Sequence, residues 1–180
     1  MDVELFAYRT TTESLDDVVA RLARRIAQAK RSPVHLIGHS LGGVVLLRML
    51  EHFASMPPGR VVLLGSPVQG SAVARRLGRL ALGRRMLGSI AKDELLADAP
   101  RVWNQTRELG IVAGTKPMGL GRVVLRFQEP NDGTVAARET ELPGATERIV
   151  LPVSHFGMLL SARVVEQTGR FLRDGRFSLA

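Results

Sequence analysis

The stretch PVHLIGHSLGGVVLLRML, residues 33–50, decides the fold of this chain. Residues 33–38 form a compact apolar run that predicts a buried strand, and residues 41–56, apolar nearly all round, predict a helix packed against a sheet. Between them, Gly38-His39-Ser40-Leu41-Gly42 has the Gly-x-Ser-x-Gly spacing of a serine at a sharp strand-to-helix turn. Such a serine projects beyond the carboxyl end of its strand, where open α/β sheets hold their sites. We therefore predict that Ser40 is a nucleophile.

The residues around Ser40 fit this role. Gly38 and Gly42 stand two positions away on either side, where a side chain is expected to clash in a strained turn. The amide of Leu41, at the N-terminus of the following helix, is expected to stabilise a developing oxyanion. Two other interpretations are a glycine-rich turn with an incidental serine and a phosphate-binding loop. The second fits poorly, because no Gly-Lys-Ser/Thr follows.

The flanking sequence predicts strands that alternate with helices. We expect strands at residues 3–8, 60–64, 109–113 and 148–151, and helices at residues 15–30 and 161–173. Residues 123–127 fit either a strand or a long loop. Alternation of this kind predicts a parallel, doubly wound α/β sheet. The chain has no internal repeat, low-complexity tract or linker, so we expect residues 1–180 to form a single domain.

A serine hydroxyl needs a general base, and the chain has four histidines. His35 falls inside the predicted buried strand, and His39 falls inside the turn, where we expect it to point away from the reacting face. His52 follows Glu51 on the predicted helix and is expected at the surface. His155 lies in a loop after a late strand, in Pro-Val-Ser-His-Phe-Gly-Met, and we predict that it is the base. The alternative is a structural or merely solvated loop histidine.

The base in turn needs a carboxylate to orient it, expected between serine and histidine in chain order. The candidates are Asp93, Glu94, Asp98, Glu108, Glu129, Asp132, Glu139, Glu141 and Glu147. Asp132 is favoured, because it stands in Glu-Pro-Asn-Asp-Gly-Thr-Val, a tight turn between two predicted strands. Asn-Asp-Gly is also good turn chemistry in its own right. Glu129 is the second choice.

These motifs resemble those of the α/β-hydrolase superfamily, especially its small bacterial lipase- and esterase-like members. Gly-His-Ser-Leu-Gly-Gly, Asp-Gly-Thr-Val and Ser-His-Phe-Gly-Met-Leu follow one another in the expected order, and the resemblance covers essentially the whole chain. It implies an α/β-hydrolase-type, mostly parallel sheet and hydrolysis of carboxylic esters through an acyl-serine. Ser40 would be the nucleophile, His155 the general base and acid, and Asp132 the residue that orients the imidazole. No metal and no organic cofactor is implied; the substrate would be a small-molecule or lipid ester.

One feature of that family is missing. Its members normally have a strand ending in a His-Gly loop, which supplies the second oxyanion donor, before the segment that resembles residues 3–8. No His-Gly occurs among the 39 residues that precede Ser40. Loss of one oxyanion donor costs about 10²–10³ in rate. We therefore expect that the fold is N-terminally truncated: either Met1 is an internal methionine of a longer protein, or the activity of the chain is impaired.

The positive charge is concentrated in one segment. The net charge is +8, and between Glu51 and Asp93 no acid occurs, whereas seven basic residues do: Arg60, Arg75, Arg76, Arg79, Arg84, Arg85 and Lys92. Residues 70–92 therefore predict either a lid- or cap-like insertion that contacts a lipid or membrane surface, or an ordinary packed helix pair with solvated arginines. Nucleic-acid binding is disfavoured, because the segment contains no aromatic residue.

Composition excludes some other classes. The chain has no cysteine, which rules out disulfides, thiol catalysis and cysteine-based metal sites. No apolar run reaches the ~18 residues that span a bilayer, and MDVELFAYRT lacks the basic start of a signal peptide. We therefore expect a cytoplasmic location for the chain as given. The competing functional class is a non-catalytic or impaired hydrolase-fold protein that binds lipid or a partner.

Overall fold

The computed structural model describes residues 2–53, 55–78, 101–118 and 129–178. Its elements are α1 (Leu15–Ala27), β1 (Leu36–His39), α2 (Leu41–His52), β2 (Val61–Leu64), α3 (Ala72–Gly78), β3 (Leu109–Gly114), η1 (Ala137–Thr140), β4 (Glu147–Leu151), η2 (Gly157–Leu159) and α6 (Ala162–Asp174). Most of the basic segment beyond α3, and the ambiguous residues 123–127, lie outside the described residues.

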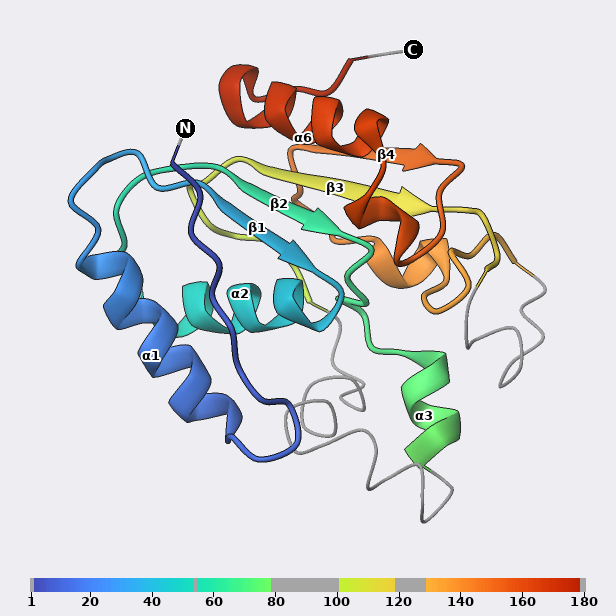
Figure 1. Cartoon of the computed structure of the whole chain (residues 1–180), viewed down its shortest axis with the longest axis horizontal. Helices are drawn as coiled ribbons and strands as arrows, with labels where there is room; N and C mark the ends of the chain where they lie inside the picture. The colour runs from blue at the N-terminus through green and yellow to red at the C-terminus, as the bar shows by residue number, and fades with distance from the viewer. Residues whose placement is uncertain (1, 54, 79–100, 119–128, 179–180) are drawn as a thin grey trace.

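The four strands form one parallel sheet in the order β1-β2-β3-β4. All four arrows point the same way in Figure 1, so the carboxyl ends of the strands share one edge. Helices α1 and α2 lie on one face of the sheet and α6 lies on the other. This three-layer arrangement confirms the predicted α/β fold with a parallel sheet.

Each face of the sheet has its own apolar core. On the α1 and α2 side, the core includes Val18, Met49 and Leu63; on the α6 side, it includes Val62 and Phe171. Val62 and Leu63 are neighbours on β2, and their side chains point to opposite faces because side chains alternate along a strand. Every residue of β2 is buried, as expected for a central parallel strand.

Local signals set the ends of the outer helices. The side chain of Ser14 accepts a hydrogen bond from the amide of Asp17 and begins α1, and Ser161 does the same for Val164 at the start of α6. Helix α6 ends at Asp174 and is capped by Gly175, whose φ of 73° is the left-handed conformation that glycine adopts without strain. Helix α1 ends at Ala27, earlier than predicted, and α2 ends at His52 instead of extending to residue 56.

The strand predicted at residues 3–8 is wrong, because these residues belong to no sheet. The segment runs extended beside α1 (Figure 1), where Arg21 donates to the carbonyl of Ala7 at 3.1 Å. Phe6 and Tyr8 pack against the core on the same side of the molecule. Alternating β-forming residues favour an extended chain, but a strand also needs a neighbour for its backbone groups. Within the described part of the chain, β1 pairs only with β2.

Candidate active site

The turn between β1 and α2 holds Ser40 in a strained conformation. Ser40 has φ 54° and ψ −126°, and among the described residues it is the only non-glycine with a positive φ. Its amide donates to the carbonyl of Leu64 at 2.9 Å, so the end of β1 stays attached to β2 right up to the turn. Strain of this kind costs on the order of 1–3 kcal/mol and is typical of functional sites.

The glycines that permit this turn are Gly38 and Gly43. A Cβ atom on Gly38 would lie 2.5 Å from the Cα of Gly43, and one on Gly43 would lie 2.1 Å from the Oγ of Ser66. Gly42 was expected to be the second crowded position, but its Cβ would meet only the Tyr8 hydroxyl, at 3.8 Å, among the described residues. The close approach therefore occurs one residue later than predicted, where α2 packs against Ser66, the second residue after β2.

Asp132 lies in a turn after β3 and is 1% exposed. Its Oδ1 accepts the amides of Thr134 and Val135 at 2.8 and 2.7 Å, so the Asn-Asp-Gly turn fixes one carboxylate oxygen and leaves the other free. Glycines at the ends of two strands make room for this side chain. A Cβ on Gly65 would lie 3.0 Å from Oδ2 of Asp132, and one on Gly114 would lie 2.8 Å from its Cβ.

His155 joins Asp132 to Ser40. Its Nδ1 lies 2.7 Å from Oδ2 of Asp132, and its Nε2 lies 2.9 Å from Oγ of Ser40. An ionised carboxylate only accepts hydrogen bonds, so Nδ1 carries the proton of the neutral ring. Nε2 is then the acceptor, and the hydroxyl of Ser40 donates to it. The His155 side chain is 3% exposed, so solvent does not compete for either nitrogen.

The three residues come from loops at the same edge of the sheet, after β1, β3 and β4, although Ser40 and His155 are 115 positions apart. The structure thus brings together the residues that the sequence singled out. It does not bring in the second-choice carboxylate, because Glu129 pairs with Arg138 at 2.7 Å.

Comparison with known proteins identifies the family. The sequence profile described as "Alpha/beta hydrolase family" matches residues 4–167. The chain belongs to the alpha/beta hydrolase family. The resemblance inferred from the three motifs is therefore confirmed. A search of curated protein sequences finds no match.

Solved structures of hydrolases share the fold. The mature Bacillus licheniformis lipase BlEst2 matches with a TM-score of 0.63 and 22% identity, over 89% of this chain and 74% of that one. The metagenomic carboxyl esterase MGS0156 matches with a TM-score of 0.57 and 16% identity, over 79% of this chain and 51% of that one. The type II thioesterase BorB from the borrelidin biosynthetic cluster matches with a TM-score of 0.51 and 18% identity, over 91% of this chain and 73% of that one. This hydrolase chain therefore spans only about half the length of the esterase.

The other histidines of the hydrolase occupy distinct places. His39 was expected to point away from the reacting face, and this is wrong: its ring centroid lies 4.7 Å from that of His155, and its Nε2 lies 2.9 Å from the His155 carbonyl oxygen. His35 precedes β1, and its Nδ1 accepts the amide of Arg60 at 3.1 Å. His52 is exposed near the end of α2, as predicted.

Electrostatics keeps His39 neutral. Burial is the main cause that lowers the pKa of His39, and the nearby His155 lowers it further. The hydrogen bond to the His155 carbonyl and the charge of Asp132 act in the opposite direction but do not prevail. The sequence did not predict this contact. Local geometry at the turn predicts the direction of the His39 side chain, but it does not predict that the loop holding His155 packs against that side chain.

Two further residues, Leu41 and Tyr8, lie beside the Ser40 turn. Leu41 is the first residue of α2, and the first amides of a helix have no partner within it. Tyr8 approaches the turn from the N-terminal segment, and burial raises the pKa of its phenol, so the hydroxyl stays a neutral donor. No sequence signal pointed to Tyr8, because its approach depends on the unpaired course of residues 3–8.

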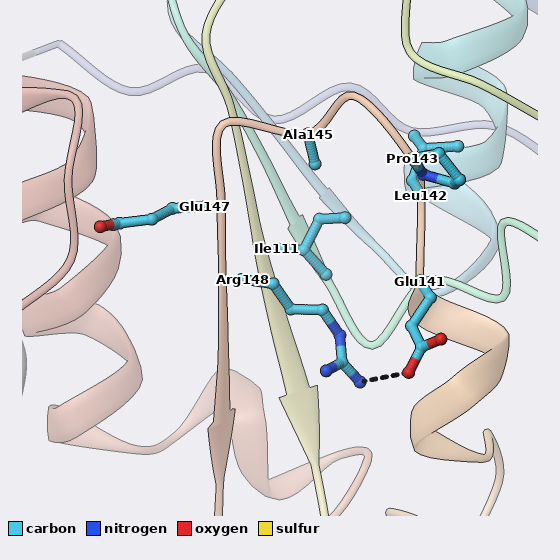
Figure 2. A pocket seen from close by; sticks show the side chains of 7 residues that line it. All are labelled: Ile111, Glu141, Leu142, Pro143, Ala145, Glu147 and Arg148. Carbon is cyan, nitrogen blue, oxygen red and sulfur yellow. Dashed lines mark ion pairs between the residues drawn. The ribbon is translucent and has the colours of Figure 1, made fainter.

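Hollows in the described part of the hydrolase lie elsewhere. Figure 2 shows a groove of about 380 Å³ at the start of β4, with an ion pair between Arg148 and Glu141 at 3.7 Å on its rim. Its lining residues are Ile111, Glu141, Leu142, Pro143, Ala145, Glu147 and Arg148. A second hollow of about 480 Å³ lies between residues 5–7 and α1. Neither is lined by Ser40, Asp132 or His155.

Within residues 2–53, 55–78, 101–118 and 129–178, no group of three or more His, Asp or Glu side chains is arranged to hold a metal ion. None of the helices in these ranges has the length and apolar character needed to cross a bilayer.

Proposed function

We propose that the chain is a serine hydrolase that cleaves carboxylic esters through an acyl-serine intermediate on Ser40. The observation that carries this proposal is the unbroken chain of hydrogen bonds from the Ser40 hydroxyl through His155 to Asp132, at 2.9 and 2.7 Å. Membership of the alpha/beta hydrolase family supports hydrolysis in general, and the chemistry of this cluster favours an acyl substrate.

Acylation would begin with the serine proton. As Ser40 Oγ attacks the ester carbonyl, its proton moves to Nε2 of His155, and the imidazolium is stabilised by the carboxylate of Asp132 at 2.7 Å. The same proton then passes to the leaving alkoxide, which departs as an alcohol. In the second half, water loses a proton to His155 as it attacks the acyl carbon. The bond from that carbon to Ser40 Oγ then breaks, the imidazolium returns its proton to Oγ, and the carboxylic acid leaves. Each half returns His155 to the neutral form.

Negative charge develops on the carbonyl oxygen in both halves. The amide of Leu41, unpartnered within α2, is the donor that we propose for this oxygen, and the helix N-terminus adds a favourable dipole. The sharp turn at Ser40 supports this role, because it makes Leu41, the residue next to the nucleophile, the first residue of α2.

A hydrolysis assay tests the proposal. We expect p-nitrophenyl esters to be hydrolysed by the full chain and Ser40→Ala to lose the reaction, while Ser161→Ala, which removes only the cap of α6, keeps it. An acyl series from acetate to longer chains would give the substrate range. Hydrolysis retained in Ser40→Ala would contradict the proposal. Binding of lipid without turnover by the wild type would favour the competing class, in which the chain binds lipid or a partner. Contact of residues 70–92 with a lipid surface stays a prediction.

A further inference from the structure

His155 is held by its backbone as well as by its ring. Its amide donates to the carbonyl of Asp132 at 2.9 Å, and its carbonyl lies 2.9 Å from Nε2 of His39. Together with the two ring nitrogens, this gives four polar contacts to one residue, and two of them lead to the segment that contains Ser40. One of these two, the bond to Ser40, must break when the serine attacks. The other, to His39, takes no part in the proton transfers.

The direction of the His39 bond follows from chemistry. A carbonyl oxygen only accepts, so Nε2 of His39 must carry a proton and donate it. Burial and the nearby His155 lower the pKa of His39, which leaves the ring neutral with its lone pair on Nδ1. A neutral donor suits this place, because a second positive charge with its ring 4.7 Å from that of His155 would oppose formation of the imidazolium. The charged and titratable groups that act on His39 are His155 and Asp132.

The bond spans the site between its two most distant strands. His39 is the last residue of β1, whereas His155 follows β4, at the other edge of the described sheet. Phe156 stands edge-on to the His155 ring, at 5.5 Å and 85°, and is itself 63% exposed, so it gives little support from the solvent side. The histidine loop therefore depends on inner contacts for its place.

We propose that His39 is a positioning residue that fixes the distance between the nucleophile and its base by holding the backbone of His155. This inference rests on the proposed function. Ser40 is joined to His39 directly, so a fixed His39–His155 contact also fixes where Nε2 of His155 lies relative to the serine oxygen. A displacement of about 1 Å between reacting groups can cost as much as 100-fold in rate.

Two substitutions separate positioning from packing. His39→Phe keeps a flat ring of similar size without a donor, and His39→Gln places an amide nitrogen where it can donate to the same carbonyl. We expect His39→Phe to lower kcat on a p-nitrophenyl ester by about 10- to 100-fold with little change in KM. His39→Gln should recover most of the loss. Unfolding temperatures of the two variants serve as the control for a merely structural effect.

The outcomes distinguish the two proposals. If the wild type hydrolyses esters and His39→Phe keeps the wild-type kcat, or His39→Gln loses as much as His39→Phe, the positioning role is overturned while the proposed function stands. If the wild type neither hydrolyses esters nor reacts at Ser40, the proposed function fails and the positioning role fails with it.

A spectroscopic measurement on the wild-type chain covers the case in which His39→Phe does not fold. Histidine labelled with ¹⁵N should show His39 protonated at Nε2 at neutral pH, with a proton that exchanges slowly because it is bonded and buried. A His39 ring protonated only at Nδ1, or an Nε2 proton that exchanges as fast as the ring proton of exposed His52, would overturn the inference.

Discussion

The two ends of the sheet both gather histidine and carboxylate groups, but they use them differently. At the amino end, Arg107 donates to the carbonyls of Pro57, Gly59 and Val34, and Arg60 pairs with Glu108 at 2.5 Å. These cations bind loops to the strands. At the carboxyl end, no cation takes part in the chain of hydrogen bonds from serine through histidine to aspartate.

Backbone strain separates the two ends as well. His35 at the amino end has an ordinary backbone and accepts one amide, whereas Ser40 at the carboxyl end is the single strained non-glycine in the described ranges. Buried polar groups alone therefore do not mark a site. The carboxyl end is marked as a candidate site by a combination of three features: a serine hydroxyl in a strained turn, an imidazole bonded to that hydroxyl, and a carboxylate that orients the imidazole.

The comparison predicts its largest effect at His155. We expect His155→Ala to lower kcat on p-nitrophenyl acetate by a factor on the order of 10⁶, because the Ser40 proton then has no acceptor. The free energy of unfolding, measured in urea, should change too little to unfold the variant, so the loss of kcat reflects the chemistry and not the stability. A variant that keeps more than about one hundredth of the wild-type rate would contradict the role given to His155.

Asp132→Asn should have the next largest effect. The amide oxygen can still accept from Thr134 and Val135, but its NH₂ group would then face Nδ1 of His155 and favour the wrong tautomer. We expect kcat to fall by about 10⁴. Glu129→Gln is the matched control, because that carboxylate pairs with Arg138, and it should leave kcat unchanged. Equal losses in both variants would show that the choice of Asp132 is wrong.

Arg107 at the amino end should affect stability instead of rate. Arg107→Ala leaves three carbonyl groups without their donor, and we expect the free energy of unfolding to fall by about 2–3 kcal/mol. Ester hydrolysis per folded molecule should stay at the wild-type level. Arg163→Ala, an exposed position on α6, controls for the loss of one positive charge. A fall in kcat for Arg107→Ala with an unchanged free energy of unfolding would contradict the view that the amino end serves stability and the carboxyl end serves catalysis.

The smallest expected effect is the pH dependence that His35 contributes. Burial first, then the charges of Arg60 and Arg107, lower the pKa of His35 below 6.5. The folded state therefore binds fewer protons than the unfolded state, so stability is fully present above pH 6.5 and is lost as pH falls through the lowered pKa. His39 acts in the same direction.

His35→Asn tests this contribution, because its amide oxygen can accept the Arg60 amide without titrating. Unfolding in urea at about pH 7 and about pH 5 should show a smaller loss of stability in the variant than in the wild type. An equal or larger loss in His35→Asn would mean that the histidine does not titrate in this range.

Local patterns predicted most of the fold. Apolar patterns indicated α1, α2 and α6, and short apolar runs indicated β1 to β4. Residues 3–8 were misjudged because a strand is defined by its neighbour, which the local sequence does not contain.

The candidate site was predictable at positions where the chemistry requires one residue type and the chain offers few residues of that type in a suitable place. Serine in the turn, histidine after the last strand and aspartate in a turn between them met that condition, and the structure brings them together. The contacts of His39 and the space that Gly65 and Gly114 leave for Asp132 were not predictable. They depend on how the loops after different strands meet at the sheet edge, which no local pattern records.

The central claim is that Ser40 is an activated nucleophile, and covalent labelling tests it most directly. A fluorophosphonate is incubated with the full chain, folded or denatured in urea, and the modified peptide is identified by mass spectrometry. We predict one adduct, on Ser40, that forms only in the folded protein and is absent from His155→Ala. A folded protein that hydrolyses esters but carries its adduct on another residue, or carries none, would contradict the account.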